Sequence, residues 1–354
     1  MAGTLLVAVA PWAARAAGER GPTPLLAYYY IWFDASSWNR AKTDYPLLGR
    51  YSSDERTVMR EHVRAAKSAG VDGFIVSWKS TSTLDRRLEQ LIAVAEQEDF
   101  KLSIIYQGLD FHRRPLPVER VAADLDKFER RYAGAQAFEM FGKPLVIWSG
   151  TWKFSRRDVS RTTRAHRRRL LVLASEKNVE GYERLADVVD GDAYYWSSVN
   201  PDTFPNYPGK LAAMGRSVHA RGGLWIAPAA PGFDARVLGG KTVVERRDGG
   251  TLVRELDAAT QSSPDAIGLI SWNEFSENSH VEPSQRFGRR YLDVLADRRN
   301  AGLPVGDFDS SEPGTTGRGY GWPLVVAFAL LVVGSLAMIV VRGRRRPRAP
   351  RQLD

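Results

Sequence analysis

The sequence predicts an α/β fold, namely a (β/α)8 TIM barrel with a C-terminal transmembrane helix. Three observations lead to this prediction. Eight short apolar runs alternate with segments of helical period between residues 22 and 302. Aromatic and polar residues gather where those runs end. Near the C-terminus, a charge-free run is followed by a cluster of arginines.

The apolar runs have the length of buried strands. Strands that alternate with helices form parallel βαβ units, and because such strands are covered on both faces they consist of continuous apolar residues. Eight units in about 275 residues agree with a (β/α)8 barrel, for which roughly 250 residues is typical. The predicted strands are 25–33, 72–78, 101–108, 144–150, 170–176, 190–197, 224–233 and 266–275.

Between and after these strands lie eight amphipathic or polar segments. The first, 54–69, opens on Ser52-Ser-Asp-Glu, which predicts a capping box, and it ends at Gly70. The other predicted helices are 83–98, 118–132, 156–169, 182–186, 207–220, 250–261 and 288–301.

An open doubly wound sheet is the alternative for this alternation of strands and helices. Such a sheet would normally carry a glycine-rich nucleotide loop after its first strand, whereas Asp34-Ala-Ser-Ser follows here. The glycines at 314–321 lie in a Gly/Ser/Pro-rich linker and follow no strand, so they do not predict a phosphate-binding loop. The barrel is therefore preferred.

The two ends of the chain predict its location. Residues 322–341 form an uncharged run long enough to cross a bilayer, and the basic tail 342–354 is expected to stay in the cytoplasm. Residues 1–17 are interpreted as a signal peptide or N-terminal apolar segment, although no basic residue precedes the apolar run. We therefore expect a single-pass protein of the cell membrane, with the barrel at 22–302 outside the cytoplasm and a linker at 303–321.

The composition argues against nucleic-acid binding and excludes sites that need cysteine. The net charge is +9, of which the basic tail contributes +5 with six Arg and one Asp, leaving +4 for the rest of the chain. This distribution does not predict nucleic-acid binding. Because the chain has no Cys, disulfides and thiolate metal sites are also excluded.

Two carboxylates follow the last predicted strand. Glu274 and Glu277 are three positions apart and lie beside Trp272. Cleavage of a glycosidic bond needs one carboxyl group held protonated and another held ionised, so the pair predicts this chemistry, with Glu277 as the acid of raised pKa. Because residues three apart on a strand point to opposite faces, the chain must turn after Glu274. The plainer interpretation is a polar loop whose glutamates cap the next helix.

Aromatic residues end almost every predicted strand. In a barrel the C-terminal strand ends meet on the catalytic face, and flat rings suit the apolar faces of sugars. The alternative is that these rings only fill the core. The rings are Tyr30, Trp32, Trp78, Tyr106, Trp148, Tyr194, Trp196 and Trp272; all except Trp148, together with Asn273, His280 and Glu282, are predicted to bind substrate.

Other chemistries find little support. The five His residues are scattered, and no H-E-x-x-H helix pairs them for zinc. His280 and Glu282 could supply two metal ligands, but no third is apparent, so no metal or other cofactor is expected. The chain also has no G-x-S-x-G nucleophile elbow.

Residues 271–284, S-W-N-E-F-S-E-N-S-H-V-E-P-S, resemble the N-E-W-x-E-G-x-x-x-E-P signature of glycoside hydrolase family 99, the endo-α-mannosidase-like barrels. Residues 49–78 and 225–234 are similar to that family's G-x-Y-S-S segment and P-x-x-x-P-G-Y-D strand. The resemblance implies a retaining hydrolase of an α-linked, mannan-like polysaccharide or glycolipid glycan. It also implies that Glu274 takes the proton of the sugar's own 2-hydroxyl, giving a 1,2-anhydro sugar, while Glu277 protonates the leaving oxygen.

The motif departs from the family at three positions. Phe275 replaces Trp, Ser276 stands where His is common, and Asn278 stands where Gly is usual. These departures leave the sugar open. They also keep open a non-catalytic carbohydrate-binding barrel, a related endo-α-glucanase and a glycan-synthesis barrel. A glycosyltransferase-like barrel would need a diphosphate site, which the sequence does not predict.

Overall fold

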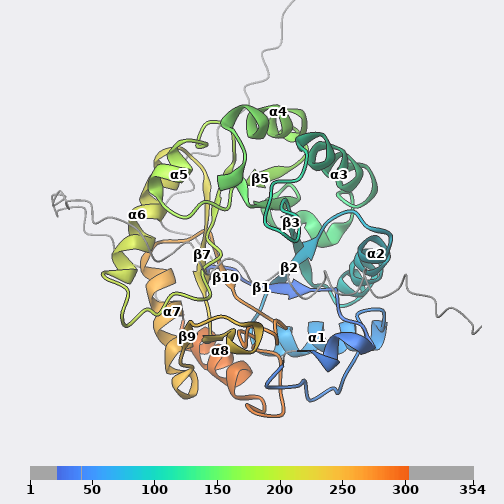
Figure 1. Ribbon diagram of the computed structural model, residues 1–354, viewed down its shortest axis with the longest axis vertical. Helices are drawn as coiled ribbons and strands as arrows, with labels where there is room; N and C mark the ends of the chain where they lie inside the picture. The colour runs from blue at the N-terminus through green and yellow to red at the C-terminus, as the bar shows by residue number, and fades with distance from the viewer. Residues whose placement is uncertain (1–21, 41, 303–354) are drawn as a thin grey trace, which may run out of the picture.

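The computed structural model describes residues 22–40 and 42–302. In this part of the chain, eight parallel strands stand side by side in a ring, and helices surround the ring on its outside (Figure 1). Each predicted apolar run contains one of these strands, which confirms the (β/α)8 barrel. The barrel strands are β1 (Leu25–Tyr30), β2 (Gly73–Trp78), β3 (Lys101–Gln107), β4 (Leu145–Ser149), β5 (Leu171–Leu173), β6 (Gly191–Ala193), β7 (Leu224–Ala229) and β10 (Ala266–Leu269).

The strand order is β5-β4-β3-β2-β1-β10-β7-β6, so β5 and β6 must meet for the barrel to close. They meet through a parallel bridge at Ala174. The amide of Ala174 donates to the carbonyl of Gly191, and the amide of Ala193 donates to the carbonyl of Ala174, both at 2.9 Å. This joint is narrow because both strands are only three residues long.

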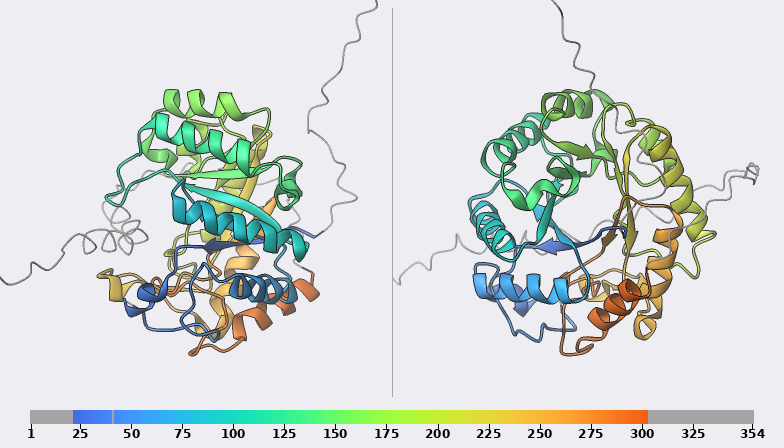
Figure 2. Two further views of the ribbon diagram at one scale, coloured as in Figure 1. Left: turned by 90° about the vertical axis from the view of Figure 1, so that its right-hand side faces the viewer. Right: turned by 180° about the vertical axis from the view of Figure 1, so that it is seen from behind.

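The helices form the outer layer, as the side view in Figure 2 shows. They are α1 (Arg56–Ser68), α2 (Ser82–Gln97), α3 (Val118–Arg131), α4 (Arg156–His166), α5 (Val179–Glu183), α6 (Tyr207–Ala220), α7 (Gly250–Gln261) and α8 (Arg290–Asn300). Short 3-10 turns are η1 (Ala35–Asn39), η2 (Gln136–Phe141), η3 (Thr151–Lys153), η4 (Arg236–Leu238) and η5 (Arg247–Gly249). A small antiparallel hairpin, β8 (Phe233–Asp234) and β9 (Val243–Val244), follows β7.

Four helix starts differ from the prediction: α2 begins at Ser82 rather than at 83, α8 begins at Arg290 rather than at 288, and the starts of α1 and α5 differ too. Helix α1 begins at Arg56 rather than at 54, and only one half of the predicted capping box forms: the Glu55 carboxylate accepts from the amide of Ser52 at 2.7 Å. Helix α5 begins before the predicted 182–186, because the Asn178 side chain caps it by accepting from the amide of Gly181 at 2.8 Å.

Alternation along the strands divides the core into two layers. Successive strand side chains point to opposite faces, so one set packs against the helices and the other fills the barrel. The outer set forms the larger buried cluster, which includes Phe74, Val76 and Trp78 of β2. The inner set forms a separate cluster: Leu26, Tyr28, Ile75, Ile105, Leu145, Ile147, Leu173, Ala193, Ile226, Ala230, Ala266 and Ile270.

The predicted transmembrane run at 322–341, the linker at 303–321, the basic tail at 342–354 and residues 1–17 lie outside the described residues. Across 22–40 and 42–302, none of the helices combines the length and the apolar character needed to cross a bilayer.

Candidate active site

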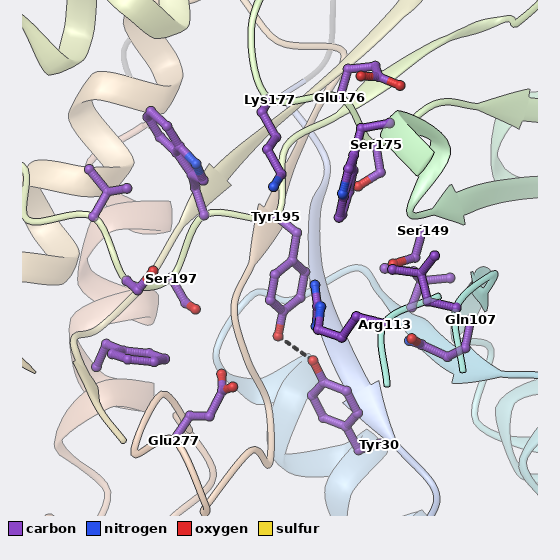
Figure 3. A pocket seen from close by; sticks show the side chains of 17 residues that line it. Tyr30, Gln107, Arg113, Ser149, Ser175, Glu176, Lys177, Tyr195, Ser197 and Glu277 are labelled. Carbon is purple, nitrogen blue, oxygen red and sulfur yellow. Dashed lines mark hydrogen bonds between the residues drawn. The ribbon is translucent and has the colours of Figure 1, made fainter. Parts of the chain in front are cut away.

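A cavity of about 1080 Å³, including its open mouth, lies at the carboxyl ends of the barrel strands. Its polar wall comes from strand ends and loops that are far apart in sequence, and Figure 3 shows Lys177, Tyr195, Tyr30 and Glu277 directed toward a shared centre. The lining residues are Tyr30, Ile105, Gln107, Leu109, Arg113, Ser149, Trp152, Ser175, Glu176, Lys177, Tyr195, Trp196, Ser197, Ser198, Val199, Phe233 and Glu277.

The loop that carries the two glutamates is closed on itself. Strand β10 ends at Leu269, and the backbone amide of Ser271 then donates to the carbonyl of Ser279 at 2.7 Å. Within the loop, the amide of Ser279 donates to the carbonyl of Glu274 at 3.2 Å, and Asn278 adopts a positive φ of 52°. The chain therefore turns after Glu274, as predicted, and the two glutamates belong to one compact loop.

Glu277 has the properties of a proton donor. Its side chain lines the cavity and is 2% exposed, and its Oε2 has no hydrogen-bond partner among the described residues. Burial raises its pKa well above the usual value, and the charge of Glu274 raises it further, while Arg113 lowers it. A carboxyl group in this setting keeps its proton near neutral pH.

Glu274, in the same loop as Glu277, is also buried, but its carboxylate accepts a backbone hydrogen bond. Its Oε1 accepts from the backbone amide of Ser276 at 2.9 Å. Burial raises the pKa of Glu274 to about 7, whereas the Ser276 amide and the charge of Lys42 act in the lowering direction. The carboxylate does not line the cavity, but its charge acts on Tyr30, which does.

Tyr30 and Tyr195 join the two halves of the site. Their hydroxyl groups hydrogen-bond to each other (Figure 3). Burial raises the pKa of both phenols well above the usual value, and the charges of Glu274 and Glu277 add to this. Both phenols therefore stay protonated at neutral pH.

The predicted aromatic wall is only partly present. Trp196 and Tyr30 line the cavity, and Trp32 stacks on Tyr30 with ring centroids 4.3 Å apart. The other four rings, Trp78, Tyr106, Tyr194 and Trp272, lie in the outer layer of the core.

The reason is the alternation along each strand. Trp78 donates to Asp85 of α2 at 3.1 Å, and the Tyr106 hydroxyl donates to Asp124 of α3 at 3.0 Å. Tyr194 packs edge-on against Trp225, and Trp272 packs against Phe74. Trp78, Tyr106 and Tyr194 face the helices rather than a ligand, because the inward positions belong to their neighbours in sequence. Trp272 lies beyond the end of β10, and its loop, not the alternation, places its ring in the outer layer.

The predicted polar residues support the glutamate loop from behind. The Asn273 amide group brackets Tyr30: Oδ1 accepts from its backbone amide at 2.8 Å and Nδ2 donates to its carbonyl at 3.0 Å. Glu282 accepts from the Tyr51 hydroxyl at 2.9 Å and hydrogen-bonds to His62 at 3.0 Å. Neither Asn273 nor Glu282 lines the cavity.

His280 is likewise a buried supporting residue. Its Nε2 lies 3.1 Å from Asp44 Oδ2, and its ring stacks on Phe275. Burial lowers the pKa of His280 to about 4, although the hydrogen bond to Asp44 acts in the raising direction. Within the described ranges, no three His, Cys, Asp or Glu side chains are grouped so that they could hold a metal ion.

Several cavity residues were missed by the sequence prediction. Gln107, Ser149, Ser175 and Tyr195 each lie two residues beyond an inner-layer residue. Counting in steps of two from the buried aliphatic residues would have identified them. Arg113 and Lys177 come from loops, where no such period exists.

Arg246 was also missed by the sequence prediction, and it fixes the glutamate loop. Its guanidinium is buried against the rings of Phe287 and Tyr291. Its Nη2 donates to the carbonyls of Asn278 at 2.7 Å and His280 at 2.9 Å. The backbone on the far side of Glu277 is therefore held by one buried cation.

Fold and cavity together define a (β/α)8 barrel that carries its site on the loops at the carboxyl ends of the strands, as enzymes with this fold do. The chain belongs to glycosyl hydrolase family 71, whose sequence profile matches residues 47–294. A search of curated proteins finds no match for this chain.

Solved structures share the fold. The GH99 endo-alpha-mannosidase from Bacteroides thetaiotaomicron superimposes with a TM-score of 0.68 and 19% identity, covering 78% of this chain and 96% of the other. The same enzyme in complex with bis-tris-propane gives 0.67 and 20%, covering 79% and 97%. A glycoside hydrolase-like protein gives 0.60 and 15%, covering 78% and 94%. The predicted likeness to a family 99 barrel is confirmed at the level of the fold.

Proposed function

We propose that this protein is a glycoside hydrolase that cleaves an α-linked glycan, with Glu277 as the proton donor and Glu274 as the base. The observation that carries the proposal is the closed loop 271–279, which holds two buried glutamates of different environment beside a cavity. Membership of glycosyl hydrolase family 71 supports hydrolysis as the reaction class.

The different environments of Glu277 and Glu274 suggest which residue is the acid and which is the base. Glu277 has a pKa raised well above the usual value, mainly by burial, and one of its oxygens is unpaired at the cavity. It can therefore protonate the leaving oxygen. Glu274, with a pKa of about 7, has the basicity that suits a general base at neutral pH.

We further propose the retaining route, in which Glu274 removes the proton of the sugar's own 2-hydroxyl and that oxygen attacks C1. The likeness of the 271–284 motif to family 99 supports this route. If Glu274 instead activated a water molecule on the opposite face of the sugar, the product would have inverted configuration. The anomeric form of the first product, followed by NMR, separates the two routes.

The substrate is proposed to be an α-mannan or an α-glucan. The first follows from the likeness to the endo-alpha-mannosidase fold, and the second was left open by the changes at Phe275, Ser276 and Asn278. Oligosaccharides of both kinds, incubated with the full-length protein, would show which is cleaved.

The decisive experiment replaces each glutamate with Gln. Because a positioned acid or base typically contributes about 10²–10⁴-fold, Glu274→Gln and Glu277→Gln should each lower kcat at least about 100-fold. Glu277→Gln should recover part of its activity on substrates with a good leaving group, since that step no longer needs an acid. Glu255→Gln is the matched control, because Glu255 is also buried but does not line the cavity. Near-normal turnover of either glutamine variant, with circular dichroism showing it folded, would refute the assignment.

One observation favours a second candidate, a carbohydrate-binding barrel without turnover. Glu274 is not part of the cavity surface, so a base at this position does not face the sugar site directly. Sugar binding by the wild-type protein, without hydrolysis of either glycan and unchanged in Glu274→Gln, would support this alternative.

We also propose that the barrel faces outward and is tethered to the cell membrane by residues 322–341. The uncharged run and the arginines after it support this topology. Protease added to intact cells should remove the barrel and leave the tail 342–354 protected. Recovery of the full-length chain from the cytosol without membranes would contradict it.

A further inference from the structure

Two cations lie in the wall of the cavity without a carboxylate partner. Arg113, in the loop after β3, and Lys177, after β5, are partly buried and line the cavity. Among the described residues, neither forms a hydrogen bond or a salt bridge with a carboxylate. Figure 3 shows the Lys177 amine and the Arg113 guanidinium on the side of the cavity next to Tyr195.

The two charges are brought together against their mutual repulsion. Burial lowers the pKa of Lys177, and the nearby positive charges of Arg113 and Lys153 lower it further. Glu176, the carboxylate whose charge acts on Lys177, is already paired with Arg184 at 3.2 Å. Bringing like charges together inside a cavity costs free energy, and an anion placed between them removes that cost.

An effect on the pKa of Glu277 accounts for the position of Arg113 but not for that of Lys177. The charge of Arg113 acts on Glu277 and lowers its pKa. Lys177 has no comparable effect on either catalytic glutamate; its ammonium lies over the ring of Trp152, 4.4 Å from the centroid. The aromatic ring positions this lysine at the cavity without neutralising it.

We propose that the cavity binds a glycan whose sugar carries an anionic group, and that Arg113 and Lys177 hold this group between them. Trp152 and Trp196 also line the cavity, so a sugar stacked on one of these rings can direct a carboxylate or a phosphate ester toward the cations. Arg presents a planar fork that matches either anion, and Lys adds a point charge. This inference rests on the proposed function in taking the cavity as the sugar site.

The test compares sugars that differ only in the charge at C6. Methyl α-glucoside and methyl α-mannoside are titrated into the full-length protein beside their uronate and 6-phosphate forms, with tryptophan fluorescence and calorimetry as readouts. One charge-assisted contact should make the charged form bind roughly 10- to 100-fold more tightly at low ionic strength. Comparison of the uronate and phosphate forms identifies which anion the site takes.

Substitutions of Arg113 and Lys177 test whether these residues cause the preference for charged sugars. Arg113→Gln and Lys177→Gln should lower the affinity for the charged sugar to that for the neutral one, and Arg113→Lys should keep part of the preference. Lys79→Gln is the matched control, because Lys79 is also partly buried over an aromatic ring, Phe111, but does not line the cavity. It should keep the full preference.

The outcomes separate this inference from the proposed function. Equal or undetectable binding of charged and neutral sugars by the wild type would overturn it, as would equal losses in Lys79→Gln and Lys177→Gln. Glu277→Gln should lose hydrolysis yet keep the charge preference. Hydrolysis of neutral glycans without a preference for charged sugars would support the hydrolase function and refute the anion site. A preference for charged sugars without hydrolysis would support the anion site and refute the hydrolase function.

Discussion

The side-chain hydroxyls of Tyr30 and Tyr195, 165 positions apart in the sequence, hydrogen-bond to each other at the mouth of the barrel. The bond joins the end of β1 to the segment after β6. One hydroxyl donates to the other, so one of the two phenolic hydrogens remains available. Because the pKa of each phenol is raised well above its usual value, mainly by burial, that hydrogen can be donated to a carboxylate or a sugar oxygen.

Removing one of these hydroxyls should slow the reaction without unfolding the protein. Tyr195→Phe removes the hydroxyl that hydrogen-bonds to Tyr30 in the cavity that Glu277 also lines. A bond between neutral groups contributes about 0.5–1.5 kcal/mol, so kcat/KM should fall roughly two- to tenfold. The control is Tyr182→Phe, because the Tyr182 hydroxyl is buried without a hydrogen-bond partner in the described part of the chain. Equal kcat/KM for Tyr195→Phe and the wild type would show that the pair is only structural.

The two layers of aromatic residues should respond differently to truncation. Trp78→Ala empties a site between β2 and α3 and should lower the free energy of unfolding by about 3–5 kcal/mol. Trp196→Ala removes part of the cavity wall and should chiefly raise KM. Chemical denaturation and steady-state kinetics on both variants test this. A Trp78→Ala protein of normal stability with a raised KM would contradict the assignment of this ring to the core.

Arg246 should be needed for both stability and activity. Arg246→Met leaves the carbonyls of Asn278 and His280 without their donor, and each unsatisfied buried group costs about 1–3 kcal/mol. We expect a lower free energy of unfolding and a reduced kcat, with Arg246→Lys in between. The exposed Arg236, paired with Asp234, provides the control: Arg236→Met should change neither quantity appreciably.

Glu255 should make stability fall as pH rises. Burial raises its pKa from 4.5 to about 8 in the folded protein, against the lowering effect of the hydrogen bond from Tyr207. The folded state therefore keeps a proton that the unfolded state releases, and stability is lost as pH rises from 4.5 through 8. Relative to Glu255→Gln, the wild type should lose about 3–5 kcal/mol between these limits. Urea unfolding at pH 5 and pH 8 measures the difference; a constant difference would be inconsistent with a buried neutral carboxyl.

His280, unlike Glu255, should make stability fall as pH falls. Burial lowers its pKa from 6.5 to about 4, so between these values the unfolded state binds a proton that the folded state does not. Stability from this residue is complete above pH 6.5 and is lost as pH falls toward 4, by about 3 kcal/mol at most. The wild-type protein compared with His280→Gln at pH 7 and pH 5 isolates the effect, since the other groups titrate in both. A difference that grew at pH 5 would have the wrong sign.

Much of the fold could be predicted because parallel strands in a barrel are covered on both faces. That coverage requires continuous apolar runs, and each run was visible in the sequence. The carboxyl ends of the strands were predicted too long: β10 ends at Leu269, whereas the run was extended to 275. Beyond Leu269 the segment still looks apolar, because Trp272 and Phe275 are buried, but the backbone there bonds within its own loop.

The site was harder to predict, for two physical reasons. Trp78 and Ser77 are adjacent, and only the phase of the alternation determines which one faces the helices. Arg113 and Lys177 approach each other only because β3 and β5 stand in the same ring, and their loops have no period to follow. The two glutamates were selected because cleavage of a glycosidic bond needs two carboxyl groups, and this pair directly follows the last predicted strand; their catalytic roles stay a prediction.

The backbone hydrogen bonds between β5 and β6 should open more readily than those between the other barrel strands. Only a few backbone hydrogen bonds at Ala174 and its neighbours hold the two strands together, whereas β2 and β3 are paired over six residues. Amide hydrogens of Ala174 and Ala193 should accordingly exchange with deuterium faster than that of Val76. Ser175 and Tyr195 each lie two residues beyond a joint strand and line the cavity. The cavity wall at Ser175 and Tyr195 therefore continues from the one pair of neighbouring barrel strands that is joined by a single bridge rather than by a paired ladder.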